Sequence, residues 1–211
     1  ADYWVWTYNV EGYDFNLIRG KTVTLSFWIK ASKTGTYCVS FAVGDASIDR
    51  SYIAEFSVSQ ANTWEKKTIT IHITTEGSPS TTNGRGMSIR WCLAAGSSFA
   101  STKDAWLSGN YLCSSSQANG LDTAGNKFWL SAIKLEIGNI ATPFTMPPLA
   151  AELDACQRYF EKSYNLSVNP GTITDTGRVV ATAAINNDYF HRDFKTKKRS
   201  SPTLGLYSPT T

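Results

Sequence analysis

Charged residues, histidines and long apolar runs are all scarce in this chain of 211 residues. Only 18% of the residues are charged and the formal net charge is +3, so the chain lacks the basic excess that predicts a nucleic-acid partner. His72 and His191 are the only histidines, and their separation matches no metal-ligand spacing. No apolar run approaches the roughly 20 residues of a membrane-spanning helix, so we expect no membrane insertion.

Catalytic signatures are also missing. The sequence contains no GxSxG, P-loop or GxGxxG pattern. Carboxylates such as Asp45, Asp49 and Asp122 are scattered through expected loops, so we expect no enzyme activity. A glycosidase pair stays open, because the distance between two carboxylates is set by the fold. No cofactor is expected, and structural calcium held by loop oxygens is an alternative that no DxDxDG loop supports.

The four cysteines, Cys38, Cys92, Cys113 and Cys156, include no CxxC pair, which argues against a zinc site. Cys38 and Cys92 alternate within expected strands, and Cys156 lies on an expected helix. We interpret all four as packed free thiols, because a thiol away from metals behaves as a small apolar side chain. A disulfide between Cys92 and Cys113 is the alternative.

The sequence is rich, by contrast, in aromatic residues and in short alternating segments. Seven tryptophans and ten tyrosines favour strands and can also stack on sugars. About seven or eight short strands with little helix predict an all-β fold, a jelly-roll β-sandwich. The alternating segments before residue 94 predict strands at Tyr3–Val10, Thr22–Ala31, Tyr37–Val43, Tyr52–Val58, Trp64–Ile73 and Met87–Leu93.

The segment Thr22–Ala31 shows the alternation most clearly. Val23, Leu25 and Phe27 share one face and are expected in the core. Trp28 lies on the opposite face among serine and threonine residues, where an exposed indole is a candidate platform for a sugar ring. The alternative is that a neighbouring element covers it.

The stretch Ala94–Asn126 has no convincing periodic element and is dominated by serine, glycine, asparagine and aspartate. Long irregular stretches in compact domains are often functional. In a sugar site, the apolar face of a pyranose stacks on an aromatic ring while its hydroxyls pair with amides and acids. The candidate carbohydrate-binding residues are therefore Trp106, Tyr111 and Trp28 for stacking, and Asp104 and Asn110 for hydrogen bonds. The alternative is that Trp106 and Tyr111 fold back and anchor the loop.

The segment Lys127–Ile137 predicts one further strand. Its odd positions Trp129, Ile133, Leu135 and Ile137 are expected on one face, and Lys134 and Glu136 on the other. Prolines at 143, 147 and 148 then exclude both helix and central strand from the connection that follows.

A helix is expected after Pro148, because apolar residues recur there at helical spacing as Leu149, Leu153, Cys156 and Phe160. Beyond it, strands are expected at Arg178–Ile185, Asp188–Phe194 and Thr203–Tyr207, too few to bury a core alone. The basic run Lys195–Arg199 is interpreted as a solvated edge, with acidic glycan as its alternative partner. We therefore expect a jelly roll in residues 1–142, an elbow and linker helix in 143–163, and a partial distal β-domain in 164–211.

The pattern LEIG–ATPF–P–EL–CQRYFEKS within residues 127–163 closely resembles a segment of tail-fibre and receptor-binding proteins of tailed bacteriophages. Further segments match the same family in order, upstream at VEGYD, KTVTLSFWIKAS and NTWEKKTITI and downstream at FKTKKRSSPTLGLYSPTT. The resemblance therefore covers most of the chain. It implies a carbohydrate-binding-module-like jelly roll joined by a linker helix to a distal β-domain.

The resemblance also implies a function. It predicts a non-catalytic receptor-binding fragment of a virion tail fibre that folds in the bacterial cytoplasm, acts outside the host cell and binds lipopolysaccharide or capsule glycan. Sister chains in a homotrimer are the other expected partners. Strand-like residues at both ends suggest a fragment of a longer fibre protein.

Two alternatives remain. In the first, the chain is a structural or assembly domain whose helix stripe forms the trimer seam, and the receptor site lies elsewhere. In the second, the chain is a capsule depolymerase.

Overall fold

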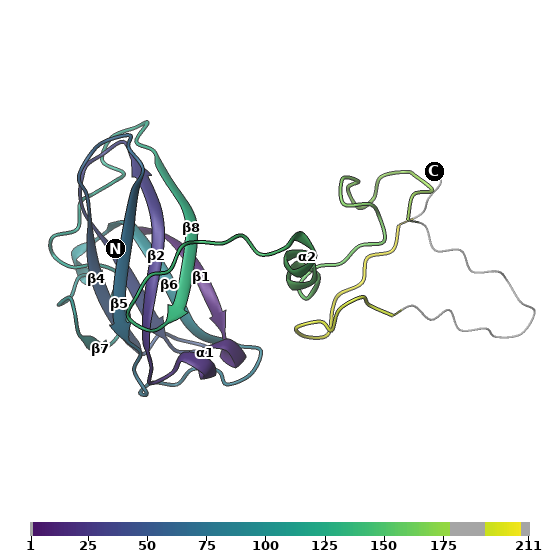
Figure 1. The fold of residues 1–211 in the computed structure, drawn as a ribbon, viewed down its shortest axis with the longest axis horizontal. Helices are drawn as coiled ribbons and strands as arrows, with labels where there is room; N and C mark the ends of the chain where they lie inside the picture. Colours follow the sequence, from purple (N-terminus) through teal and green to yellow (C-terminus); the bar gives the residue numbers. More distant parts are fainter. Residues whose placement is uncertain (1, 178–192, 208–211) are drawn as a thin grey trace, which may run out of the picture. The chain divides into compact units, whose positions relative to one another are not determined.

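The computed structural model describes residues 2–177 and 193–207 (Figure 1). Within this part the chain forms eight strands, two short α-helices and one 3-10 turn. It divides into two units, Ala1–Phe144 and Thr145–Thr211, and all eight strands belong to the first.

The first unit is a sandwich of two antiparallel sheets, which confirms the predicted all-β class with a short helix (Figure 1). The five-stranded sheet has the order β1 (Tyr3–Glu11), β6 (Arg85–Ala95), β3 (Gly35–Val43), β4 (Arg50–Val58), β7 (Trp106–Ser108). The three-stranded sheet has the order β5 (Glu65–His72), β2 (Thr22–Ala31), β8 (Phe128–Ile137). Most connections cross from one sheet to the other, which is typical of a jelly roll.

The core between the sheets contains the side chains that alternation predicts to face inward. Val23, Leu25 and Phe27 of β2 are fully buried. Phe27 meets the rings of Phe56 and Trp91 edge to face, with centroids 5.2 and 5.7 Å away. Burial of this continuous apolar layer is the main stabilisation of the fold.

A second apolar cluster lies on the other face of the five-stranded sheet, under the loop that follows β6. It consists of Cys38, Ile53, Cys92, Leu112 and Cys113. The three cysteines of this cluster are buried free thiols, and Cys156 is exposed. The loop predicted as irregular also contains the 3-10 turn η1 (Ser97–Phe99) and the short strand β7. It is therefore an ordered cover for one face of the sheet.

The helix α1 (Gly12–Ile18) follows β1 directly and was not predicted. Its buried residues are Gly12 and Phe15. The backbone of Gly86 in β6 lies so close to the helix that an added Cβ would sit 2.3 Å from the Phe15 Cβ. A single turn or two of helix carries too short an apolar pattern to be recognised from sequence.

The prediction for the faces of β8 is wrong at its first half. Ala132 has a φ of 49°, and the ladder between β2 and β8 shifts register between the pairs Ser26–Lys134 and Trp28–Ser131. A bulge of this kind reverses which side chains face inward. Trp129 is therefore on the outer face opposite Lys30, whereas Leu135 still packs against the core.

The two sheets differ in width, which leaves part of the wider sheet uncovered. Tyr8 of the edge strand β1 pairs with Ile89, so the two side chains share a face. Ile89 is 1% exposed but Tyr8 is 61% exposed, because β8 does not extend over β1. An open seam therefore runs along this side of the sandwich.

The second unit contains the helix α2 (Leu149–Gln157), and no strand occurs in its described residues. The predicted strand Thr203–Tyr207 is irregular, while Arg178–Ile185 and most of Asp188–Phe194 lie outside the described residues. In the basic run, Lys198 forms a largely buried ion pair of 2.6 Å with Glu161, so this lysine is not part of a solvated edge.

The expected apolar stripe of α2 is largely exposed. Leu149 and Phe160 are exposed large apolar residues, and Cys156 is exposed as well. The helix ends at Gln157, before Phe160. Among the described residues, no helix combines the length and the hydropathy needed to span a membrane.

Candidate functional site

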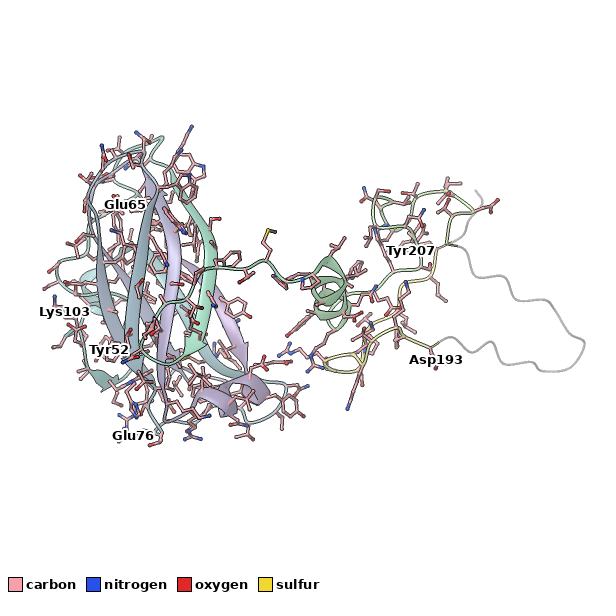
Figure 2. The ribbon with its side chains drawn as sticks, in the orientation of Figure 1. Tyr52, Glu65, Glu76, Lys103, Asp193 and Tyr207 are labelled. Atoms are coloured by element: carbon pink, nitrogen blue, oxygen red, sulfur yellow. The ribbon has the colours of Figure 1, made fainter. Side chains whose placement is uncertain are left out.

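Trp106 closes the sandwich at the β7 side, opposite the open seam. Its indole Nε1 donates a hydrogen bond of 2.8 Å to the main-chain oxygen of His72 at the end of β5. The centroid of its ring lies 5.6 Å from that of Tyr52, which is its ladder partner in β4 and is labelled in Figure 2. The donor and one ring face of Trp106 are thus engaged internally, which favours the anchoring alternative for this residue.

Tyr111 and Asn110 are held by the buried side chain of Arg90 in β6. Arg90 Nη1 donates to Asn110 Oδ1 at 2.6 Å, and Nη2 donates to the Tyr111 main-chain oxygen at 2.9 Å. Burial, and next the nearby charge of Arg85, lower the pKa of Arg90 to about 10. A buried guanidinium needs acceptors, and these two residues supply them.

Asp104 and Trp28 lie in different surroundings. Asp104 is exposed, has a φ of 61° and donates its main-chain N–H to Ile53 at 2.8 Å. Trp28 lies on the outer face of the three-stranded sheet and is 40% exposed. The structure therefore gathers Asp104, Trp106, Asn110 and Tyr111 in one loop beside β4, and it places Trp28 on the other sheet.

A larger gathering of aromatic side chains lies along the open seam, where β1 and β8 are the edge strands. We call it the seam groove, a hollow of about 380 Å³ lined chiefly by Trp4, Trp6, Leu121, Lys127, Phe128 and Trp129. Trp4 is 46% exposed, and its ring meets that of Trp6 edge to face at 5.9 Å. A shallow hollow of this size, lined by aromatic rings, can take a flat ligand that stacks on those rings.

The floor of the seam groove is rigid. The ring of Phe128 packs edge to face on the buried Tyr37 at 5.1 Å. The backbone of Gly120 lies so close to the Phe128 ring that an added Cβ would be 2.8 Å from the ring atoms. The Gly120 N–H donates a hydrogen bond to the main-chain oxygen of Leu93. Because these contacts already hold Phe128 in place, binding a ligand would cost little further side-chain entropy at this residue.

A second hollow of about 510 Å³ adjoins the seam groove and shares Trp4 and Leu121 with it. We call it the polar hollow because, although most of its lining is apolar, it contains more polar side chains than the seam groove does. Its lining includes Asp2, Gln117 and Asn119. Gln117 Nε2 donates to the main-chain oxygens of Cys92 and Ala118, which leaves the buried Oε1 without a partner. An unpaired buried acceptor is costly, and no group of the described residues satisfies this one.

Together the two hollows place stacking rings beside amide and carboxylate groups. The seam groove itself is lined by no carboxylate, and the polar hollow contributes only Asp2. Across residues 2–177 and 193–207, no three His, Cys, Asp or Glu side chains are grouped so as to hold a metal ion. The side chains that line the seam can stack on a ring and form hydrogen bonds.

The sequence reasoning missed the seam groove for two reasons. Trp4 and Trp6 were recognised only as members of an opening strand, because strand periodicity does not reveal which strand forms an edge. Trp129 was expected on the core face of its strand, and the bulge at Ala132 reverses that. The aromatic density of Tyr3–Tyr8 was the one available signal.

The fold and the groove define a class: an all-β sandwich with an aromatic surface groove at one open edge. Comparison of the chain with protein-family models, with curated proteins and with solved structures found no match.

Proposed function

We propose that this chain is a host-recognition module of a bacteriophage tail fibre, which binds lipopolysaccharide or capsule glycan of the bacterial surface in the seam groove and does not cleave it. The observation that carries the proposal is the cluster of Trp4, Trp6 and Trp129 around one hollow beside a polar hollow. The resemblance of residues 127–163 to tail-fibre proteins supplies the biological setting.

Stacking supports a glycan as the ligand. The apolar face of a pyranose ring pairs with an indole, while its hydroxyls need acceptors and donors such as Gln117 and Asn119. A single shallow site of this kind binds in the millimolar to high micromolar range, and a trimeric fibre with several copies raises the avidity.

The absence of a carboxylate pair along the seam groove supports binding without cleavage. Glycosidases use two carboxyl groups about 5–10 Å apart. The groove lining contains none, and Asp122 beside it is paired with Lys33 and Asn126. Release of reducing ends from purified capsule would contradict this part of the proposal and favour a depolymerase.

The test is a glycan array followed by titration of the best oligosaccharide. The double variant Trp4→Ala plus Trp129→Ala removes two stacking faces worth about 1 kcal/mol each, so we expect at least a tenfold loss of affinity. The matched control is Trp106→Phe, which alters an aromatic at the opposite edge. Equal binding by the double variant and the native chain, with both folded, would contradict the proposed site.

A second candidate function is assembly with sister chains, and the exposed helix α2 favours it. Leu149, the first residue of α2, and Phe160, three residues past its end, expose 80% and 62% of their surface, and large exposed apolar side chains often mark a contact surface. Sedimentation of the chain at rising concentration tests this function. A trimer that dissociates in the variant Leu149→Ser plus Phe160→Ser supports it, and a monomer at all concentrations contradicts it.

A further inference from the structure

The outer face of the three-stranded sheet carries an unusual set of side chains at one end. In the ladder, Trp28 lies between Lys66 of β5 and Ser131 of β8. Two residues further along β2, Lys30 lies opposite Trp129. Trp64 is the residue before β5 and directly precedes Glu65, the partner of Ile29, so it lies at the same end of the sheet as Lys30. We call this set, Trp28, Lys30, Trp64, Lys66 and Trp129, the Lys–Trp platform.

The rings of the platform are accessible. Trp28 and Trp64 are 40% and 42% exposed, although they lie on the solvent face of a half-buried sheet. At the other end of the same face the positions are occupied by the small polar residues Thr24, Ser26 and Thr70, of which Thr24 and Ser26 are buried. The indoles are therefore confined to one end of the face.

The lysines of the platform are not neutralised by carboxylates. Lys30 Nζ lies 4.5 Å from the centroid of the Trp129 ring, a cation–π contact. Among the described residues it forms no ion pair with a carboxylate. Lys66 is exposed and forms no hydrogen bond or ion pair with residues 2–177 or 193–207. The nearest acid in register, Glu65 (Figure 2), is already bound by Lys67 and by the amides of Ser59 and Gln60.

We infer that the Lys–Trp platform is a second glycan subsite, selective for sugar units that carry an anionic group. The exposed indoles of Trp28 and Trp64 offer faces to a sugar ring. The two ammonium groups, which no carboxylate of the described residues neutralises, offer positive charge to a carboxylate or phosphate on that sugar. This inference rests on the proposed glycan function and adds the ligand class. Trp129 belongs to both the platform and the seam groove, so one polymer spans the two subsites.

Nucleic acid is the other polymer that combines stacking bases with negative charge. It needs a basic track along its backbone, with several phosphates neutralised together. The platform offers two lysines, and the whole chain has a net charge of +3. An anionic sugar, with one charge for every one or two rings, fits this charge density better.

The test compares two probes that differ only in charge: an oligogalacturonate and its methyl ester, titrated into the full chain at low salt. We expect the native chain to prefer the acid by about fivefold, as two exposed ion pairs allow, and to lose that preference in high salt. A phosphorylated oligosaccharide in parallel separates phosphate from carboxylate recognition.

Two charge variants identify the residues. Lys30→Gln plus Lys66→Gln is expected to remove the preference for the acid over the ester. The control Lys21→Gln changes an exposed lysine just before β2, at the opposite end of the sheet, and keeps the preference. Thermal unfolding checks that each variant is folded, which these surface positions make the expected result.

The outcomes are distinguishable from failure of the proposed function. Suppose that the native chain binds acid and ester with equal affinity, and that the Trp4→Ala plus Trp129→Ala variant binds neither. This result overturns the anionic subsite and leaves the seam groove in place. No binding of any oligosaccharide overturns the proposed function itself. Tighter binding of a single-stranded oligonucleotide of equal charge overturns the assignment of the platform to a glycan.

Discussion

At the scale of single residues, Trp106 is the clearest case of a polar aromatic side chain used to close a fold. We expect Trp106→Phe to lower the free energy of unfolding by about 1–2 kcal/mol, because the His72 carbonyl loses its donor and the edge loses packing. Urea unfolding measures the loss.

The same variant separates anchoring from recognition. Binding of the oligosaccharide that the native chain prefers is expected to stay within a factor of two, because the Trp106 donor is turned to His72. A large loss of affinity without a loss of stability would instead indicate that Trp106 is part of the binding site.

Glu55 gives a prediction about pH. Hydrogen bonds from Lys103 Nζ at 2.6 Å and from Ser114 Oγ at 2.5 Å lower the pKa of Glu55 below its ordinary 4.5 (Figure 2 labels Lys103). The unfolded chain therefore takes up a proton at higher pH than the folded chain does. The resulting stabilisation is complete above about pH 4.5 and is lost as the pH falls through the lower folded value.

We expect Glu55→Gln to reduce the free energy of unfolding by about 1 kcal/mol at pH 7 and by less at pH 2.5. Glu76→Gln is the control, because Glu76 forms an exposed ion pair with Arg50 and should matter little at either pH (Figure 2). Urea titrations at both pH values provide the comparison, and an equal loss for Glu55→Gln at pH 2.5 would rule out the charge as the cause.

At the scale of elements, the close packing of α1 on β6 depends on Gly86. A Cβ at this position would meet the Phe15 Cβ at 2.3 Å, far inside van der Waals contact. We expect Gly86→Ala to cost about 1–3 kcal/mol through overpacking, visible as a lower midpoint in thermal unfolding.

Gly125 supplies a contrast to Gly86, since a Cβ there has open space around it, although its φ of 91° still disfavours alanine. Gly125→Ala tests backbone strain alone, and Gly86→Ala tests the clash. If Gly86→Ala costs as much in a Phe15→Gly background, where that Cβ is absent, as it does in the native chain, the contact between helix and strand is not the cause of the loss.

At the scale of the whole molecule, both apolar clusters lie within residues 1–144. A chain ending at residue 144 should therefore unfold cooperatively at the same temperature as the full chain and bind the same oligosaccharide with the same affinity. Calorimetry and titration of the two chains provide the measurement. A clearly lower midpoint for the shorter chain would mean that residues 145–211 stabilise the sandwich.

The sequence by itself determined the layers of the sandwich. Val23, Leu25 and Phe27 alternate with polar side chains, and a strand with one apolar face has to bury that face against a second sheet. This is local information, since the period of two along one strand needs no knowledge of its neighbours. For the same reason Trp28 was recognised as an outward-facing tryptophan.

Only the tertiary structure decided which aromatic residues meet. The bulge at Ala132 moves Trp129 to the outer face, and the unequal width of the sheets exposes Trp4 at an edge while Trp106 closes the other. Pairing between segments far apart in the chain sets the register shifts, the edge positions and the cross-strand neighbours. The alternation within one segment does not determine any of these features.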